Sequence, residues 1–125
     1  MQLFLIAILG LVGVFSRYGV DLLVAKLGVH AHWGTFAINL LGSFVVTLIY
    51  VMGAERHWIF PELRVALLVG LMGGFTTFSS YSLQGALLLE SGGSLTPLLY
   101  ILLSPVCGIA LAVAGLHVFR AALPL

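Results

Sequence analysis

The stretch best suited to chemistry is Gly73-Gly74-Phe75-Thr76-Thr77-Phe78-Ser79-Ser80-Tyr81-Ser82, inside a long apolar run. Adjacent glycines cost helix stability and permit non-helical dihedral angles. A carbonyl freed within a bilayer must then be satisfied by protein, water or an ion. The stretch therefore predicts a helix broken at Gly73-Gly74 and a coordination or permeation site beside it. Tight helix packing is the alternative, because Gly70 and Gly74 form a GxxxG pair.

A second set of polar residues repeats at every fourth position: Thr35, Asn39, Ser43 and Thr47. Residues at this spacing share one slowly drifting face of a helix. The Asn39 amide has donors and acceptors to satisfy in hydrocarbon, so it should face protein or a water-filled path. Hydrogen bonding between helices is the favoured interpretation for Asn39 alone, and the whole stripe makes a polar path more credible.

Aromatic residues accompany these polar groups. Phe78 and Tyr81 are three apart and share a helix face, where ring edges turned towards a pore would favour an anion. Core packing is the more common role of aromatics at helical spacing. Further along, Tyr100 and Ser104 repeat the four-residue spacing as a polar track. It stops at Gly108, and the small residues from there could equally form a packing seam.

Arg17 is the only full charge well inside an apolar segment. It could hold an anion at a pore mouth, but near a helix end snorkelling to the interface is the favoured interpretation. No carboxylate lies at the centre of a segment, which favours passive conduction over proton coupling. The acidic residues near segment ends are Asp21, Glu55, Glu62 and Glu90.

Other chemistries find no support in the sequence. The four histidines lie in loops or near the C-terminus without a third ligand at a metal-like spacing. No nucleophile–base pair, Walker motif or dinucleotide fingerprint is present, so no enzyme activity is expected. A net charge of +1 makes nucleic acid an unsuitable partner. The single cysteine, Cys107, is interpreted as a small buried hydrophobe.

The composition of the chain indicates that these residues are positioned by membrane-spanning helices. The 125 residues are 62% hydrophobic and 7% charged, whereas soluble domains carry about 25% charged residues. The sequence therefore predicts an all-α integral membrane protein with one domain, residues 1–125. The N-terminus lacks the basic region of a cleaved signal peptide. Four apolar segments are long enough to span a bilayer: Leu3 to about Val24, Trp33 to about Gly53, about Leu63 to Leu89, and about Leu95 to Phe119.

The orientation in the membrane is weakly specified. Four spans put both termini on one side, which carries Arg56, Arg64 and Arg120, while the other side carries Lys26 and Arg17. A chain this balanced could insert both ways round and form antiparallel dimers. An ordinary fixed topology, set by one extra charge, is the alternative.

Three motifs give the chain a resemblance to the CrcB/Fluc fluoride channels of bacteria and archaea. They are Ser16-Arg17-Tyr18, the run from Gly34 to Phe44 around Asn39, and the glycine–threonine stretch from Gly73 to Ser82. Length and four-span layout match over the whole chain. The resemblance departs from the family's pattern at Tyr81, where Phe is usual, and at Gly108, where Ser is common.

The resemblance implies a dual-topology homodimer of antiparallel subunits with two narrow fluoride pores. It also implies a structural sodium ion at the dimer centre, bound by the backbone carbonyls of Gly73 and Thr76. The residues expected along the fluoride path are Arg17, Thr35, Asn39, Phe78, Ser79, Ser80, Tyr81, Tyr100 and Ser104.

By the same resemblance, the expected function is passive export of fluoride across the inner or plasma membrane. Neutral HF crosses lipid, ionises inside and is trapped, and an inside-negative potential drives the anion out. One alternative is a small multidrug-type transporter, but that family needs a membrane-embedded Glu in its first helix, and Asp21 near the helix end is the first acidic residue here. A packing-only accessory subunit would leave the glycine–threonine stretch unexplained.

Overall fold

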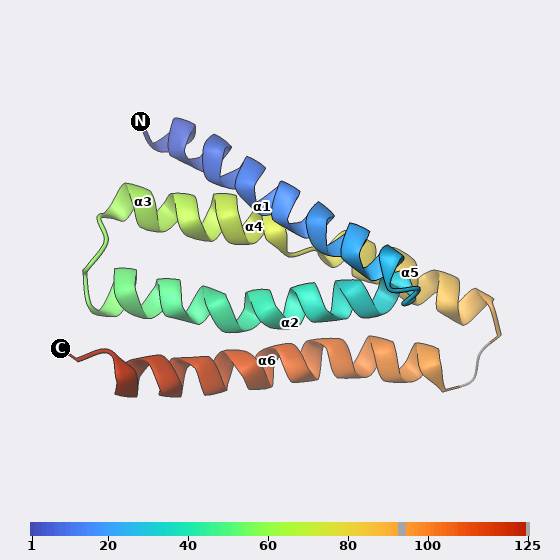
Figure 1. The fold of residues 1–125 in the computed structure, drawn as a ribbon. Coiled ribbons are helices and arrows are strands. Elements are labelled where there is room, and N and C mark those ends of the chain that lie inside the picture. The colour runs from blue at the N-terminus through green and yellow to red at the C-terminus, as the bar shows by residue number, and fades with distance from the viewer. Residues whose placement is uncertain (93–94, 125) are drawn as a thin grey trace.

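The protein forms four long helical spans, as predicted. The structure is a computed structural model that describes residues 1–92 and 95–124, and all the regular structure in this part of the chain is helical. The first span is α1 (Gln2–Lys26), and the second joins α2 (Ala31–Tyr50) to a π-helical turn, η1 (Val51–Glu55). The third runs over 61–90, and the last is α6 (Thr96–Ala122) (Figure 1). Each is long and apolar enough to cross a bilayer, so this is a multi-pass membrane protein.

The third span has four parts. It begins with α3 (Pro61–Val65), continues as a π-helix, η2 (Ala66–Met72), and returns to α-helix in α4 (Gly73–Phe75). The final part is α5 (Phe78–Glu90). Thr76 and Thr77 between α4 and α5 are extended, with φ, ψ of −81°, 160° and −150°, 117°.

The prediction that placed the break at Gly73-Gly74 was therefore wrong in position. Gly73 has φ −63° and ψ −35°, which is ordinary right-handed helix. The extended residues are threonines, whose branched side chains favour extended backbone. The Thr77 hydroxyl also accepts the Ser80 N–H at 3.2 Å, and so caps the start of α5.

The glycines before the break serve packing. A Cβ on Gly70 would lie 2.6 Å from the Ile6 carbonyl oxygen, and one on Gly74 would lie 2.7 Å from that of Gly10. Neither position leaves room for a side chain, so η2 and α4 lie directly against the α1 backbone. This is the small-residue packing that the GxxxG pair indicated as the alternative.

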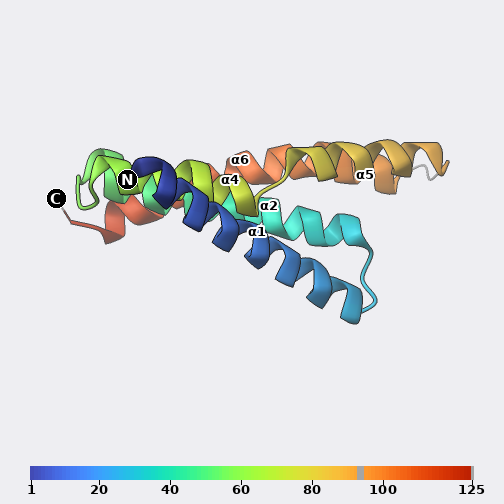
Figure 2. The same ribbon diagram turned by 90° about the horizontal axis from the view of Figure 1, so that it is seen from above.

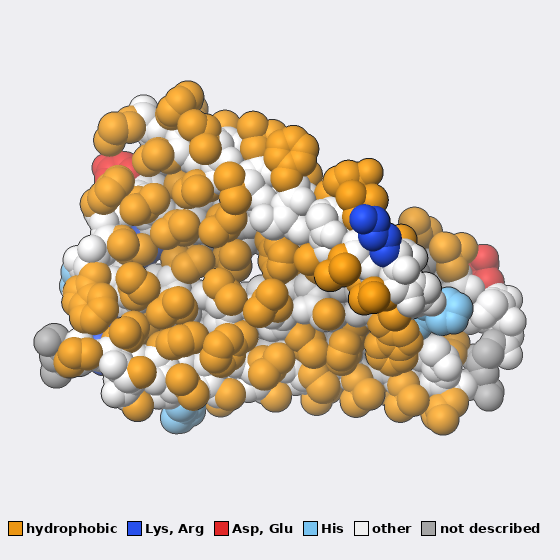
Figure 3. All heavy atoms as spheres, viewed as in Figure 1, with side chains coloured by type: hydrophobic (Ala, Val, Ile, Leu, Met, Phe, Trp, Pro, Cys, Tyr) orange, Lys and Arg blue, Asp and Glu red, His pale blue; other side chains and the backbone are white. Residues whose placement is uncertain are grey.

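The break changes which helix the third span packs on. Its first half lies against α1, whereas α5 lies against α6 (Figures 1 and 2). α2 packs along α6 and also contacts η2, with Ile38, Ile49, Met72 and Phe75 forming the buried core. Many large apolar side chains are exposed on the helices, and the face seen in Figure 3 is largely apolar, as lipid contact requires.

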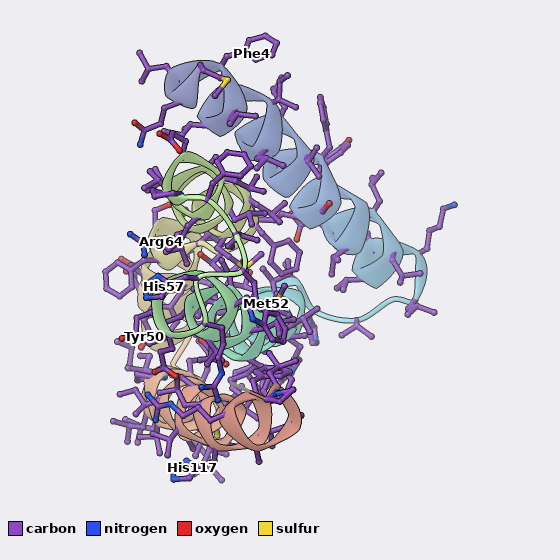
Figure 4. All side chains as sticks on the ribbon, turned by 90° about the vertical axis from the view of Figure 1, so that its left-hand side faces the viewer. Phe4, Tyr50, Met52, His57, Arg64 and His117 are labelled. Atoms are coloured by element: carbon purple, nitrogen blue, oxygen red, sulfur yellow. The ribbon has the colours of Figure 1, made fainter. Side chains whose placement is uncertain are left out.

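Both termini lie at one end of the bundle, together with the loop after η1 (Figures 1 and 4). There Arg120 on α6 forms a bidentate ion pair with Glu55, with Nη2–Oε1 at 2.6 Å and Nε–Oε2 at 3.1 Å. Arg64 donates to the Gly53 carbonyl at 3.2 Å, and Arg56 to that of Arg120 at 3.1 Å. The three arginines of this end thus tie helix ends together.

Candidate functional site

The break in the third span is fastened to α2 by Asn39. Asn39 Nδ2 donates to the Thr77 carbonyl at 2.9 Å, and the Thr77 N–H donates to Asn39 Oδ1 at 2.8 Å. The side-chain amide therefore makes the two hydrogen bonds that a neighbouring strand would make. It satisfies both backbone groups of an extended residue at membrane depth. This agrees with the favoured interpretation of Asn39 as a hydrogen-bonding link between helices.

Two carbonyls near the break lack their usual helical donors. The donor four residues after Gly73 is the Thr77 N–H, which is bonded to Asn39. The donor four residues after Thr76 is the Ser80 N–H, which is bonded to Thr77 Oγ1. Both residues line a groove.

This groove has a volume of about 560 Å³ and runs over α2, η2, α5 and α6. Its wall is largely apolar and holds hydroxyl groups, an amide and aromatic rings. Phe78 is 78% exposed at its margin. No carboxylate is among the described residues that line it. The predicted site residues in its wall are Asn39, Gly73, Thr76, Phe78, Tyr81 and Ser104.

A second cavity of about 240 Å³ lies between α1, α2 and α5. Three further predicted residues line it: Arg17, Thr35 and Ser80. Two residues that the sequence analysis did not select, Thr77 and Gln84, also line this cavity, and Thr77 lines the groove as well. Their polarity was visible in the sequence, but only the turn of α5 places them beside α1.

Arg17 does not snorkel as the sequence favoured. Its Nε donates to the Gly74 carbonyl at 3.1 Å, and the residue is half-buried beside the break. The i+4 donor of Gly74 is the Phe78 N–H, which lies beyond two extended residues. The guanidinium therefore satisfies a carbonyl that the break would otherwise leave in a low-dielectric environment, while its charge lies beside the second cavity.

A chain of aromatic contacts links the two cavities. The Phe78 and Tyr81 rings are 5.6 Å apart, and the Tyr81 and Tyr100 rings are 5.4 Å apart. Tyr100 is fully buried and lines neither cavity, and its hydroxyl donates to Gln84 Oε1 at 2.9 Å. The Tyr81 hydroxyl donates to the Ile101 carbonyl at 2.6 Å. Both tyrosine protons are thus engaged with protein, and the Tyr81 ring remains at the groove.

The two serine hydroxyls in the groove wall are also engaged with the backbone. Ser43 Oγ donates to the Asn39 carbonyl at 2.7 Å, and Ser104 Oγ donates to the Tyr100 carbonyl at 2.6 Å. Ser79 is exposed and lines neither cavity. Each hydroxyl has one proton to donate. Turning it towards an anion in the groove gives up a hydrogen bond worth about 1 kcal/mol, a small cost for a hydroxyl that can rotate.

Comparison with known proteins places this arrangement in a family. The family model described as CrcB-like protein, Camphor Resistance (CrcB), matches residues 4–116. A protein of Agrobacterium fabrum named fluoride-specific ion channel FluC is 41% identical over 93% of this chain and 94% of its own length. Proteins of the same name from Allorhizobium ampelinum and Geobacter sp. are 40% and 37% identical, over 92% and 96% of this chain and 93% and 98% of their own lengths. The chain belongs to the CrcB family.

Proposed function

We propose that this protein is a fluoride-selective channel that exports fluoride passively from the cytoplasm. The observation that carries the proposal is the match to the CrcB family along nearly the whole chain, with relatives named as fluoride-specific ion channels. The site supports it physically, because the groove offers hydroxyls, an amide and ring edges without any carboxylate. A channel function involves no catalysis, in agreement with the sequence.

Fluoride is small and strongly hydrated, so a selective path must replace its water with several donors. The rotatable hydroxyl of Ser104 and the ring edges of Phe78 and Tyr81 supply weak donors along the groove. Arg17 supplies a charge at the second cavity, whose wall also holds Asp21, and its Nε donates to the Gly74 carbonyl. Weak, multiple interactions suit conduction, because an ion must leave a site as readily as it enters.

A second copy of the chain covers the groove in the proposed assembly. Phe78 and Gly73 are exposed at a groove that contains polar backbone, which lipid cannot satisfy. In the dimer proposed, the two subunits are antiparallel and form two pores in the cell's inner or plasma membrane. The family resemblance motivates this arrangement.

The residues around Gly73 and Thr76 fit the structural sodium ion that the resemblance implies. Their carbonyls have lost the helical donors described above, and neutral hard oxygens are suitable ligands for a hard cation. These two residues of each subunit would hold the ion. When bound, it supplies positive charge that keeps the carbonyls of two subunits together.

Efflux from liposomes tests the function. Purified protein is reconstituted into vesicles that contain either fluoride or chloride, with equal pH on both sides and a potassium ionophore to balance charge. We expect rapid release of fluoride and release of chloride at the rate of protein-free vesicles. Comparable chloride release, or fluoride release only with a pH gradient, would contradict the proposal. If vesicles loaded with a cationic dye release that dye, the result would instead support the multidrug-type transporter.

A further inference from the structure

A cluster of aromatic and histidine side chains at the start of α2 is not used by the proposed function. The His30 and His32 rings are stacked, with centroids 5.6 Å apart and planes within 11°. His32 also meets the Tyr100 ring edge-on at 5.4 Å and the Trp33 ring at 5.0 Å. The cluster therefore continues the aromatic chain of the site out to the loop between α1 and α2.

His32 is unusual within this cluster. It is only 9% exposed, and its Nε2 atom is buried without a hydrogen-bond partner. A neutral imidazole can leave that nitrogen as an unprotonated acceptor, with the proton on the other nitrogen. A protonated imidazole carries hydrogen on both nitrogens, so it would bury an N–H without an acceptor and a charge without a partner. His32 can therefore keep its place only while it is neutral.

The position of His32 matters for the site through Tyr100. The Tyr100 ring lies between those of His32 and Tyr81, and its hydroxyl holds the side chain of Gln84. Gln84 lines the cavity that contains Arg17. Because the Gln84 oxygen accepts the Tyr100 proton, the amide nitrogen of Gln84 is left to face other partners. Loss of His32 from the cluster would remove one of the three ring contacts that hold Tyr100, and Tyr100 in turn holds Gln84.

We propose that His32 is a positioning residue for Tyr100, and that its protonation in acid displaces it from the cluster and lowers fluoride conduction. The effect on conduction rests on the proposed function. The displacement of the ring from Tyr100 and Trp33 does not.

The groups around His32 do not offer a counter-ion. The connecting loop contributes His30, which would repel a charged His32, and α6 contributes Tyr100. On α5, Gln84 and Tyr81 both contact Tyr100, which in turn contacts His32. On α1 the charged residues are Arg17 and Asp21, which line the neighbouring cavity. Among residues 1–92 and 95–124 neither histidine forms an ion pair with a carboxylate.

The test measures fluoride current through the full-length protein in planar bilayers at about pH 7.5 and about pH 5, the range in which imidazoles titrate. Current is the suitable readout, because neutral HF leaks through lipid but carries no charge. We expect about fivefold less current in acid for the native chain. His32→Phe keeps an aromatic ring against Tyr100 and cannot titrate, so its current should be equal at both pH values. His117→Gln, a change at an exposed histidine on α6, is the matched control and should keep the acid response.

A second measurement follows the ring itself. In a Trp58→Phe background the remaining tryptophan is Trp33, whose fluorescence reports the neighbouring imidazole. We expect an emission change between the two pH values that is absent in His32→Phe. An acid-insensitive current in the native chain, or an equal acid response in His32→Phe, would overturn the proposal. If no fluoride current is seen at either pH, the proposed function fails, and a missing Trp33 response would then overturn the displacement of His32 as well.

Discussion

At the scale of single residues, the structure separates groups that hold the fold from groups that face open space. Asn39 and Arg17 both looked like candidates for direct contact with an ion. In the structure each makes a hydrogen bond to backbone at the break, Asn39 to Thr77 and Arg17 to Gly74. The sequence identified both as costly polar groups in an apolar environment. Their partners could not be predicted, because those partners are carbonyls and amides that only the break makes available.

Replacement of Asn39 by Ala should destabilise the protein strongly. It leaves the N–H and the carbonyl of Thr77 unpaired, and each buried unpaired group costs about 1–3 kcal/mol. Thermal unfolding in detergent measures the loss. The matched control is Ser43→Ala on the same face of α2, which removes only a back-bond to a carbonyl. Equal stability of the two variants would show that the Asn39–Thr77 pair does not hold the break.

Tyr81→Phe should leave fluoride conduction close to the native rate. The hydroxyl is directed at the Ile101 carbonyl on α6, so its loss removes no donor from the groove, and the ring edge remains. The variant should lose about 1 kcal/mol of stability, the net value of one hydrogen bond. Liposome efflux and thermal unfolding check the two parts. A tenfold fall in fluoride efflux would mean that the hydroxyl takes part in the path.

At the scale of helices, the sequence predicted the spans well and the break less well. Apolar length predicted four spans to within a few residues, because a bilayer imposes about 20 apolar residues on each helix. The glycines drew attention to the correct stretch, but the extended residues are Thr76 and Thr77. Glycine permits non-helical backbone, but it also permits the closest packing of two helices. In this protein the glycines stay helical and pack against α1. That contact depends on tertiary structure, which local propensity does not contain.

The close packing of η2 on α1 gives a prediction at this scale. Gly70→Ala should force α1 away, because its Cβ would lie 2.6 Å from the Ile6 carbonyl oxygen. The melting temperature in detergent should fall clearly. Gly19→Ala on α1 is the matched control: no atom lies within 4 Å of its Cβ position, and alanine favours a helix over glycine by about 1 kcal/mol. A Gly70→Ala variant as stable as Gly19→Ala would contradict the packing described.

At the scale of the whole molecule, charge and shape bear on orientation and assembly. Arg17 lies beside the break, so among the described residues Lys26 is the one Lys or Arg near the end of the bundle opposite the termini, against Arg56, Arg64 and Arg120 at the other. The sequence-based count of three against two therefore becomes three against one at the ends. Arg56 and Arg64 each donate to a neighbouring carbonyl, and Arg120 forms an ion pair with Glu55. The proposed dual topology thus requires that this difference of two basic side chains between the ends does not fix a single orientation during insertion.

Labelling of intact cells tests the orientation. In a Cys107→Ser background, which removes the only native cysteine, Leu27→Cys places a thiol on an exposed residue at one end. Trp58→Cys places one on an exposed residue at the other. For an antiparallel dimer, an impermeant reagent should reach about half of the molecules of each variant. Complete labelling of one variant and none of the other would show a single fixed orientation and exclude the antiparallel pair.

The most direct test of fluoride selectivity is the reversal potential of the purified protein in a planar bilayer. A fluoride gradient is imposed, chloride is varied on one side, and the pH of the two sides is changed separately. For a fluoride-selective channel we expect a reversal potential at the equilibrium value for fluoride that does not move with the chloride or proton gradient. A reversal potential that follows chloride or protons would contradict this expectation.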